Sequence, residues 1–384
     1  MIETYLSLEI NESPVWLWTF LIVLLVLTAF VQIYYFLSLY NQVSKHKKVN
    51  IKSVMEPVSV IICARNEAEN LTRFLPSVLN QFYPDFEVIV DNDGSSDQTS
   101  DVLNEFKRQY TNLYTTEIGV REDYKQGKKL AQTIGIKAAN HDQLLFIDAD
   151  CEPVNPNWIR HMQSNFLHQT QIILGYGKYI SEPGLLNKWI RTDTTYIAMQ
   201  YLAMAIKGRP YMGVGRNMAY RKSLFFERKG FASHLNLASG DDDLFVNENA
   251  DFYNTVIEIH PESFTQSDPK KTFKQWLRQK KRHLTTSTRY KKSHKITLGF
   301  ELLTRVLFYS LATTILAFGI LPVYVAALIL IRYFFLGLVF KRCMNRLREN
   351  NLLLLSFVYD LLWPFIGAFL ALGNTFRKKK TKWQ

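Results

Sequence analysis

The chain has 384 residues, of which 47% are hydrophobic, and its formal net charge is +12 at pH 7. This length permits more than one domain and a substantial buried core. The three cysteines, Cys63, Cys151 and Cys343, are scattered without the spacing of metal ligands. The composition therefore excludes a cysteine-rich zinc module, and we assign the cysteines no chemistry.

The first element predicted along the chain is a membrane helix. Residues 15–44 contain no charged residue and are mostly apolar, which exceeds the ~20 residues that a bilayer-spanning helix requires. Three glutamates precede this run, whereas a cleaved signal peptide has a basic start and a shorter apolar core. Because Lys45, His46, Lys47 and Lys48 follow directly, the positive-inside rule places the next domain in the cytoplasm. Residues 1–48 thus form the predicted anchor of a multi-pass protein of the cell (inner) membrane.

Residues 49–260 are the predicted cytoplasmic domain, in which apolar strands alternate with helix-like stretches. This alternation is typical of an α/β sheet. Strands are expected at residues 58–64, 86–90 and 143–147, and helices at 66–80, 98–110 and 128–140. Polar clusters follow the strand ends, and in open α/β sheets that edge is where ligands bind.

The most informative of these clusters is Asp148-Ala149-Asp150, which follows an apolar strand directly. Two carboxylates two residues apart at a strand end both reach one metal, and magnesium or manganese prefers such oxygen ligands. The motif predicts metal-bound diphosphate chemistry at Asp148 and Asp150. A solvated acidic turn is the alternative for the motif taken alone.

The turns also exclude two other kinds of nucleotide site. The first strand is followed by Arg65-Asn66-Glu67 and not by G-x-G-x-x-G, and the chain has no P-loop. Acidic strand ends with a single Lys128 instead suit a nucleotide diphosphate that is neutralised mainly by metal.

Residues 261–297 form a basic segment that follows the α/β domain. Pro261–Lys295 holds eleven Lys and Arg (270, 271, 274, 278, 280, 281, 282, 289, 291, 292 and 295) against Glu262 and Asp268. Aromatic and leucine side chains are interleaved with these cations, so we expect an amphipathic helix on anionic membrane lipids. Nucleic acid is the alternative partner for such charge, but the flanking membrane segments argue for lipid and against nucleic acid.

Residues 298–384 are the predicted C-terminal membrane region of two or three helices. Two spans are expected to meet near Gly319–Pro322 and to be followed by a basic loop. Residues 352–372 form a further apolar segment, interrupted by Asp360 and Pro364 and flanked by basic residues at both ends. This segment either spans the bilayer or is a bent re-entrant or interfacial element. Asp360 is a functional candidate, although a helix-end residue facing the headgroups is the interpretation we favour.

Seven sequence segments in this order resemble those of the membrane-associated family 2 glycosyltransferases with a GT-A fold, which include ceramide glucosyltransferase-like and polysaccharide synthase-like enzymes. The resemblance covers about residues 57–290. It rests on VSVIICARNEAENL, FEVIVDNDGSSDQT, GKKLAQTIGIKAA, LLFIDADCEP, GVGRNMAYRKSLF, SGDDDLF and QKKRH. It implies a Rossmann-like mixed sheet that binds a nucleotide-sugar donor and a divalent metal.

The resemblance also implies roles for single residues on the donor side. Ala64, Arg65, Glu67 and Asp93 correspond to the part that holds base and ribose, and Lys128 to a phosphate-neutralising lysine. Asp148 corresponds to a residue near ribose and metal, and Asp150 to the direct metal ligand. This chain has Asp91-Asn92-Asp93 where the family usually shows adjacent aspartates, so the base-contacting residue and the nucleoside stay open.

On the acceptor side, counting back from Leu244 places Asp241 at the position of the general base. A register shifted by one would assign that role to Asp242. Gln279 and Arg282 match the Q-x-x-R-W motif and are expected near the diphosphate and the acceptor. His283 stands in place of the Trp that serves processive synthases, which favours transfer of one or few sugars.

The predicted function is an inverting glycosyltransferase that moves a sugar from a nucleotide-diphosphate sugar, with a UDP-sugar as the first expectation, to a lipid or membrane-held glycan acceptor. One alternative is a processive polysaccharide synthase. A catalytically silent nucleotide-sugar-binding membrane subunit and a phosphotransferase using the same metal are two others.

Overall fold

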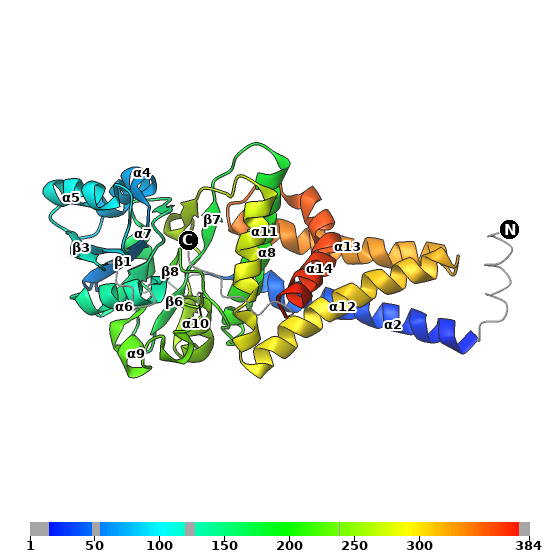
Figure 1. Cartoon of the computed structure of the whole chain (residues 1–384). Coiled ribbons are helices and arrows are strands. Elements are labelled where there is room, and N and C mark those ends of the chain that lie inside the picture. The colour runs from blue at the N-terminus through cyan, green and yellow to red at the C-terminus, as the bar shows by residue number, and fades with distance from the viewer. Residues whose placement is uncertain (1–14, 48–53, 120–126, 238, 376–384) are drawn as a thin grey trace.

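The soluble part of the chain is built on a mixed seven-stranded sheet (Figure 1). The computed structural model describes residues 15–47, 54–119, 127–237 and 239–375, so Lys48 and the basic tail at 377–380 lie outside the described residues. The strands, in spatial order, are β3 (Leu113–Glu117), β2 (Phe86–Asn92), β1 (Val58–Ala64), β4 (Gln143–Phe146), β8 (Met218–Arg221), β6 (Ile172–Leu174) and β9 (Thr255–Ile257). The first four are parallel, and β8 runs antiparallel to both of its neighbours. This sheet confirms the predicted α/β fold.

Helices cover both faces of the sheet because successive side chains of each strand point to opposite sides. All seven residues of β1 are buried. Val60 and Ile62 pack in one cluster with α4 (Ala68–Leu79), α5 (Thr99–Gln109) and α7 (Trp158–Gln163), whereas Ile61 packs on the other face with α6 (Lys128–Ala138). The strand and helix boundaries agree with the sequence-based ranges to within about two residues.

The carboxyl ends of the parallel strands meet at one edge of the sheet. Ala64 at the end of β1 pairs with Asn92 at the end of β2, and Ile61 pairs with Phe146 at the end of β4. The turns that follow β1 and β2 are also tied to each other, because Ser96 N donates to Asn66 Oδ1 at 2.8 Å. Asn66 adopts a φ of 55°, which asparagine tolerates better than most residues.

A second, three-stranded sheet adjoins this edge. It contains β5 (Cys151–Pro153), β10 (Thr265–Ser267) and β7 (Gly177–Tyr179), with β10 in the middle. The chain that leaves Asp150 therefore enters a sheet whose other outer strand ends in Tyr179. Short helices complete the domain: α9 (Lys222–Glu227), η2 (Ala232–His234), α10 (Asp243–Asn249) and η3 (Pro261–Ser263).

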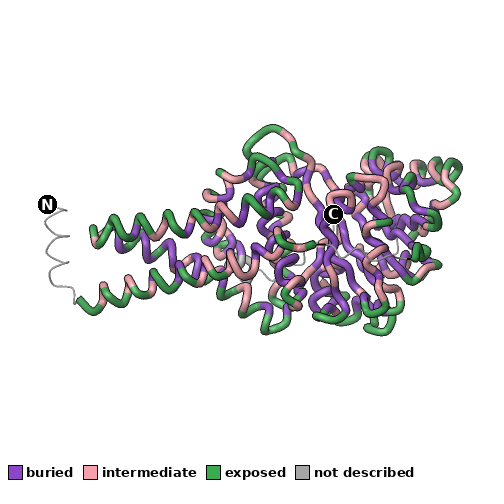
Figure 2. The backbone as a smooth tube through the Cα atoms, turned by 180° about the vertical axis from the view of Figure 1, so that it is seen from behind, coloured by how far each residue is buried: buried purple, intermediate pink, exposed green. Residues whose placement is uncertain are grey.

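Four helices in the described part of the chain are long and apolar enough to cross a membrane, as judged by length and composition. The first is α2 (Val15–Tyr34), which continues through the π-helix η1 (Tyr35–Tyr40) into α3 (Asn41–Lys45). The others are α12 (Lys292–Ala317), α13 (Pro322–Arg346) and α14 (Leu353–Thr375). The turn between α12 and α13 confirms the predicted meeting point near Gly319. Large apolar side chains such as Phe20, Phe30 and Phe334 are exposed. Figure 2 shows exposed stretches of backbone along the extended helices, so their surface suits lipid better than water.

Two helices lie between the sheet and the long helices: α8 (Leu185–Ile206) and α11 (Phe273–Leu284). Both run at a steep angle to α2, α12 and α13 (Figure 1). α11 starts at Thr272, whose hydroxyl accepts a hydrogen bond from Gln275 N in a capping box. After the short η4 (Ser287–Arg289), α12 begins at Lys292, so residues 292–297 of the basic segment are the first turns of a long apolar helix.

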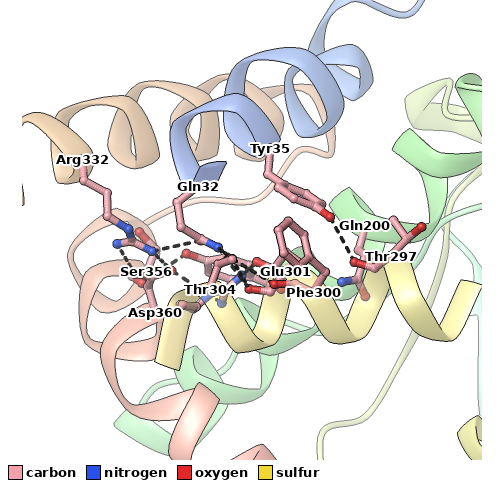
Figure 3. Close-up of polar contacts among 12 residues, drawn as sticks. Gln32, Tyr35, Gln200, Thr297, Phe300, Glu301, Thr304, Arg332, Ser356 and Asp360 are labelled. Carbon is pink, nitrogen blue, oxygen red and sulfur yellow. Dashed lines mark hydrogen bonds and ion pairs between the residues drawn. The ribbon is translucent and has the colours of Figure 1, made fainter. Parts of the chain in front are cut away.

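Asp360 lies inside the helix bundle and does not face the headgroups, so the interpretation favoured from the sequence is wrong. Its side chain is fully buried, and Arg332 Nη1 donates to it at 2.6 Å (Figure 3). Arg305 Nη1 lies 3.5 Å from Asp360 Oδ1, and Nη2 of the same guanidinium pairs with Glu301. A carboxylate excluded from water needs such partners, and the local sequence around Asp360 gave no sign of cations 28 and 55 residues away.

Candidate active site

Lys128 joins two acidic segments of the strand-end edge. It is the first residue of α6, and its Nζ lies 2.7 Å from Asp148 Oδ1 and 2.9 Å from Asp241 Oδ2. Burial would raise the pKa of Asp241, but the charge and hydrogen bond of Lys128 outweigh it and hold that pKa below its usual value. Asp148 and Asp241 are 93 residues apart in the chain, and this lysine brings them together.

Asp148 and Asp150 offer oxygen ligands for a divalent cation. Their carboxylate oxygens and the Cys151 sulfur lie within 4.8 Å of one another. Burial raises the pKa of the Cys151 thiol, which stays neutral and donates to Asp150 Oδ1 at 3.4 Å. The thiol is therefore a poor ligand, and the two half-exposed carboxylates fit a hard cation such as magnesium or manganese.

The residues expected to hold the nucleoside converge on the turns after β1 and β2. Asp93 N donates to Ala64 O at 2.9 Å, and Arg65 Nη1 lies 3.6 Å from Asp93 Oδ2. Asp93 is fully buried, yet neither of its carboxylate oxygens accepts a hydrogen bond from the described residues. Glu67 is half-buried, and burial together with the charges of Asp150 and Asp148 raises its pKa.

Asp91, the other carboxylate of the second strand end, points into the core. It is fully buried beneath Gly135, where an added Cβ would lie 2.0 Å from Asp91 Oδ2. Burial raises the pKa of Asp91 to about 8, although a hydrogen bond from Thr116 acts in the opposite direction. Of these two carboxylates, Asp93 is the one beside Arg65.

The acidic triplet before α10 divides into one carboxylate paired with Lys128 and two bound by other parts of the chain. Asp242 caps α10, because Oδ1 accepts from Asp243 N at 2.7 Å and Oδ2 from Gly215 N at 2.9 Å. Burial and the neighbouring Asp241 and Asp243 raise the pKa of Asp242 to about 7. Asp243 accepts hydrogen bonds from Thr286 and from Tyr290 OH, the latter at 2.7 Å.

Helix α11 brings the expected Gln279 and Arg282 onto one face. Gln279 Nε2 donates to Tyr179 OH at 3.4 Å, and Arg282 Nε is buried without a hydrogen-bond partner among the described residues. His283 keeps an accessible surface, but the surrounding protein and the charges of Lys280 and Arg282 lower its pKa to about 3. It is therefore a neutral side chain at neutral pH.

Lys280 lies on a different face of α11 from Gln279. It was predicted to be one of the cations facing the membrane, but it is buried in the protein. Its side chain is nearly buried and pairs with Asp193 of α8. Asp193 also accepts from Tyr359 OH of α14 at 2.7 Å. A helix places residues one position apart on different faces, so Lys280 ties α11 to α8 while Gln279 contacts Tyr179 on another face.

Sequence reasoning missed two residues beside Gln279. The guanidinium carbon of Arg216 lies 4.5 Å from the ring centre of Tyr179 in a cation–π contact. Arg216 belongs to the GVGRN run that contributed to the resemblance, and a cation in that run was the available signal. Tyr179 lies in a short strand that has no distinctive motif, so nothing local marked it.

A solved structure with a similar architecture is the mannosyltransferase PcManGT of Pyrobaculum calidifontis, with a TM-score of 0.57 and 17% sequence identity. The match covers 89% of this chain and 99% of that one. At this identity the likeness concerns the fold alone, and the predicted GT-A fold is confirmed. The mixed sheet, the acidic strand-end edge and the apolar helices together define a GT-A domain joined to helices that are long and apolar enough to cross a membrane.

The family comparison is consistent with that class. The family described as Glycosyl transferase family 2 matches residues 59–227, and the one described as Glycosyl transferase family group 2 matches residues 144–371, which is more than half of the chain. This chain belongs to the family 2 glycosyltransferases.

Several curated relatives match parts of the chain. Glycosyltransferase AglE of Haloferax volcanii is 39% identical over 109 residues, which are 28% of this chain and 34% of the relative. The poly-beta-1,6-N-acetyl-D-glucosamine synthase of Staphylococcus epidermidis is 35% identical over 107 residues, which are 28% of this chain and 23% of the relative. The probable glycosyltransferase YdaM of Bacillus subtilis is 28% identical over 235 residues, which are 59% of this chain and 54% of the relative. The chain thus spans about a quarter to a half of the length of these relatives.

Proposed function

We propose that this chain is an inverting glycosyltransferase that moves a sugar from a nucleotide-diphosphate sugar to a lipid or membrane-held glycan acceptor at the cytoplasmic face. The observation that carries this proposal is the bridge from Asp148 through Lys128 to Asp241. A proton acceptor for an incoming hydroxyl lies there beside the carboxylates that suit a metal-bound diphosphate.

The donor is proposed to bind across the strand-end edge. Ala64, Arg65 and Glu67 contact the nucleoside, and the carboxylate oxygens of Asp93, which accept no hydrogen bond from the described residues, accept hydrogen bonds from N–H groups of the base. Asp148 and Asp150 hold the metal, and Lys128 with Arg282 neutralises phosphate charge. A bound divalent cation acts as a Lewis acid that lowers the cost of negative charge on the departing nucleoside diphosphate. PcManGT is described in complex with GDP-Man and Mn2+, which makes manganese the first metal to test.

Asp241 is proposed to be the general base. Its carboxylate takes the proton of the acceptor hydroxyl while that oxygen bonds to the anomeric carbon, and the bond from this carbon to the diphosphate oxygen breaks. Direct displacement inverts the anomeric configuration. Asp242 is the competing candidate because its pKa of about 7 lies near neutral pH, but both of its oxygens already accept backbone hydrogen bonds.

A processive polysaccharide synthase is the second candidate function. It is favoured by the 107-residue likeness to the synthase of S. epidermidis. The residue at the Trp position of the Q-x-x-R-W motif argues against a processive synthase. It is the neutral His283, which lacks the large aromatic surface of a tryptophan. The length of the glycan product distinguishes the two functions.

Replacing the proposed base tests the catalytic assignment. Asp241→Asn removes the proton acceptor but keeps the shape of the side chain, so transfer should fall by about two to four orders of magnitude. Donor binding should persist, measured as thermal stabilisation of the detergent-solubilised protein by nucleotide sugars with manganese.

Asp242→Asn is the matched control and should cost less transfer activity. If Asp242→Asn is the more damaging change while donor stabilisation is kept, the base is Asp242. If no nucleotide sugar stabilises the wild-type protein with or without metal, the proposed function itself is contradicted.

A further inference from the structure

The course of α14 differs from that of a helix that crosses the bilayer beside α13. Its first turns follow α13, where Phe357 approaches Gly337 and its ring packs on Tyr333. Beyond Asp360 the partners change, because Trp363 packs against Trp276 of α11. In Figure 1, α2, α12 and α13 extend away from the soluble part, whereas α14 stays beside α8 and α11.

The chain just before α14 and the second turn of α14 are both fixed to one short stretch of α8. Glu349, just before α14, accepts from Arg191 Nε at 2.9 Å. Ten residues further, Tyr359 donates to Asp193 at 2.7 Å, and its ring packs on Trp189. Residues 189–193 form little more than one helical turn, so the chain gains little distance from α8 between Glu349 and Tyr359.

The depth of this contact follows from the charges of α11. Lys274, Arg278 and Lys281 on α11 are exposed, and such side chains are costly in the hydrocarbon core. α11 therefore lies at headgroup level. Trp363, which touches α11, lies at the same level, where tryptophan is enriched in membrane proteins.

The outer side of α14 is a continuous apolar stripe. Leu354, Val358, Leu361, Phe365 and Phe369 are between 39% and 81% exposed and recur at helical spacing. The inner side carries Ser356, Tyr359 and Asp360, which are buried against the protein. One side of α14 therefore packs on the protein, and the other presents apolar side chains that suit acyl chains.

We propose that α14 does not cross the bilayer but lies half-immersed in the leaflet on the catalytic side, with its apolar stripe against the acyl chains. The chain after α14 then returns to the side of the catalytic domain. The basic residues at 341–348 and at 377–380, which flank α14, obey the positive-inside rule only in this arrangement. The proposal does not depend on the sugar-transfer activity.

Cysteine labelling from the two sides of the membrane tests this topology. The native cysteines are buried, so a membrane-impermeant maleimide should report introduced cysteines in the folded protein. Gln109→Cys, exposed on α5, marks the catalytic side, and Val323→Cys, at a site that is 76% exposed in the first turn of α13, marks the other end of the bundle. Thr381→Cys should label from the same side as Gln109→Cys. Labelling of Thr381→Cys from the opposite side, or from neither side before detergent is added, would overturn the proposal.

Immersion depth gives a second measurement that needs no reactive tail. Fluorophores at Leu354→Cys, Leu361→Cys and Phe369→Cys are quenched by lipids carrying a nitroxide either near the headgroup or at the chain end. All three positions should be quenched more by the shallow nitroxide. Stronger quenching of position 361 by the deep nitroxide, with the other two shallow, would identify a spanning helix.

Discussion

At the scale of single residues, the site shows how neighbours assign different properties to identical side chains. Asp241, Asp242 and Asp243 are adjacent in the chain, yet they pair with Lys128, with backbone N–H groups and with two hydroxyls. The charge of Lys128 lowers the pKa of Asp241, whereas burial raises that of Asp242. The sequence identified the triplet, but only the contacts distinguish its members.

Replacing Lys128 should shift the pH dependence of transfer. Because Lys128 holds the pKa of Asp241 down, Lys128→Met should raise that pKa and move the acid limb of kcat, measured at saturating donor, to higher pH. The sign follows because the base works only when ionised. Lys137→Met, at an exposed position of the same helix, is the control. An acid limb that does not move in Lys128→Met would argue against Asp241 as the base.

Because Asp91 is buried, we expect the free energy of unfolding to fall as pH rises. Its folded-state pKa of about 8 lies above the ordinary value, so its favourable contribution is complete below about pH 4 and is lost as pH rises to about 8. Asp91→Asn should reduce the loss of unfolding free energy between pH 5 and pH 9 by about 4 kcal/mol, because about three pH units of that window lie below the folded-state pKa of about 8. Asp101→Asn, exposed on α5, should leave the pH dependence as it is. An equal pH dependence in Asp91→Asn and wild type would refute this account.

At the scale of elements, the strands and helices around the strand-end edge were predictable because their signals are local. Apolar runs ending in Arg65, Asp93 and Asp148 mark strand ends, and parallel pairing then brings those ends together. The partners of Asp193, Lys280 and Asp360 were not predictable, because each lies on a distant helix. From the sequence alone, a lysine in a basic segment such as Lys280 is expected to be solvated, because the carboxylate of Asp193 that it pairs with lies far away in the chain.

The pair Lys280–Asp193 should stabilise the attachment of α11. Lys280→Met leaves Asp193 buried without its cation, which should lower the free energy of unfolding by about 3–5 kcal/mol. The double variant Lys280→Met with Asp193→Asn should recover part of that loss, because the unpaired charge is gone. Lys274→Met, exposed on the same helix, is the control, and thermal unfolding in detergent is the measurement. A Lys280→Met protein as stable as this control would show that the pair contributes nothing.

At the scale of the whole molecule, α11 lies between the sheet that carries the proposed active site and the long apolar helices (Figure 1). Lys271, just before α11, and Lys274, in its first turn, are exposed. The apolar Phe273 between them is exposed as well. Such a surface is attracted to anionic lipids, and the attraction weakens with salt. We therefore expect the orientation of the site to depend on lipid charge.

Replacing Lys270, Lys271 and Lys274 with Gln should reduce the dependence of activity on anionic lipid. The full chain, reconstituted in neutral and in anionic vesicles, should be more active in the anionic ones, and both the triple change and added salt should shrink that difference. Gln at Lys107 and Arg108, on α5 far from the long helices (Figure 1), is the control. Equal activity of the wild-type protein in the two kinds of vesicle would contradict the expected attraction between these lysines and anionic lipids.

The buried charges of the helix bundle also bear on how the chain is assembled during synthesis. Arg305 and Arg332 precede Asp360 in the chain and are synthesised before it, with Glu301 as the acidic partner already present. Gln32 of the first helix accepts a hydrogen bond from Arg332 in the folded protein. This contact forms only after the whole α/β domain has been synthesised. A ribosome that stops before residue 360 therefore releases a chain with an uncompensated arginine between apolar helices, and only a completed chain presents a neutral bundle to the lipid.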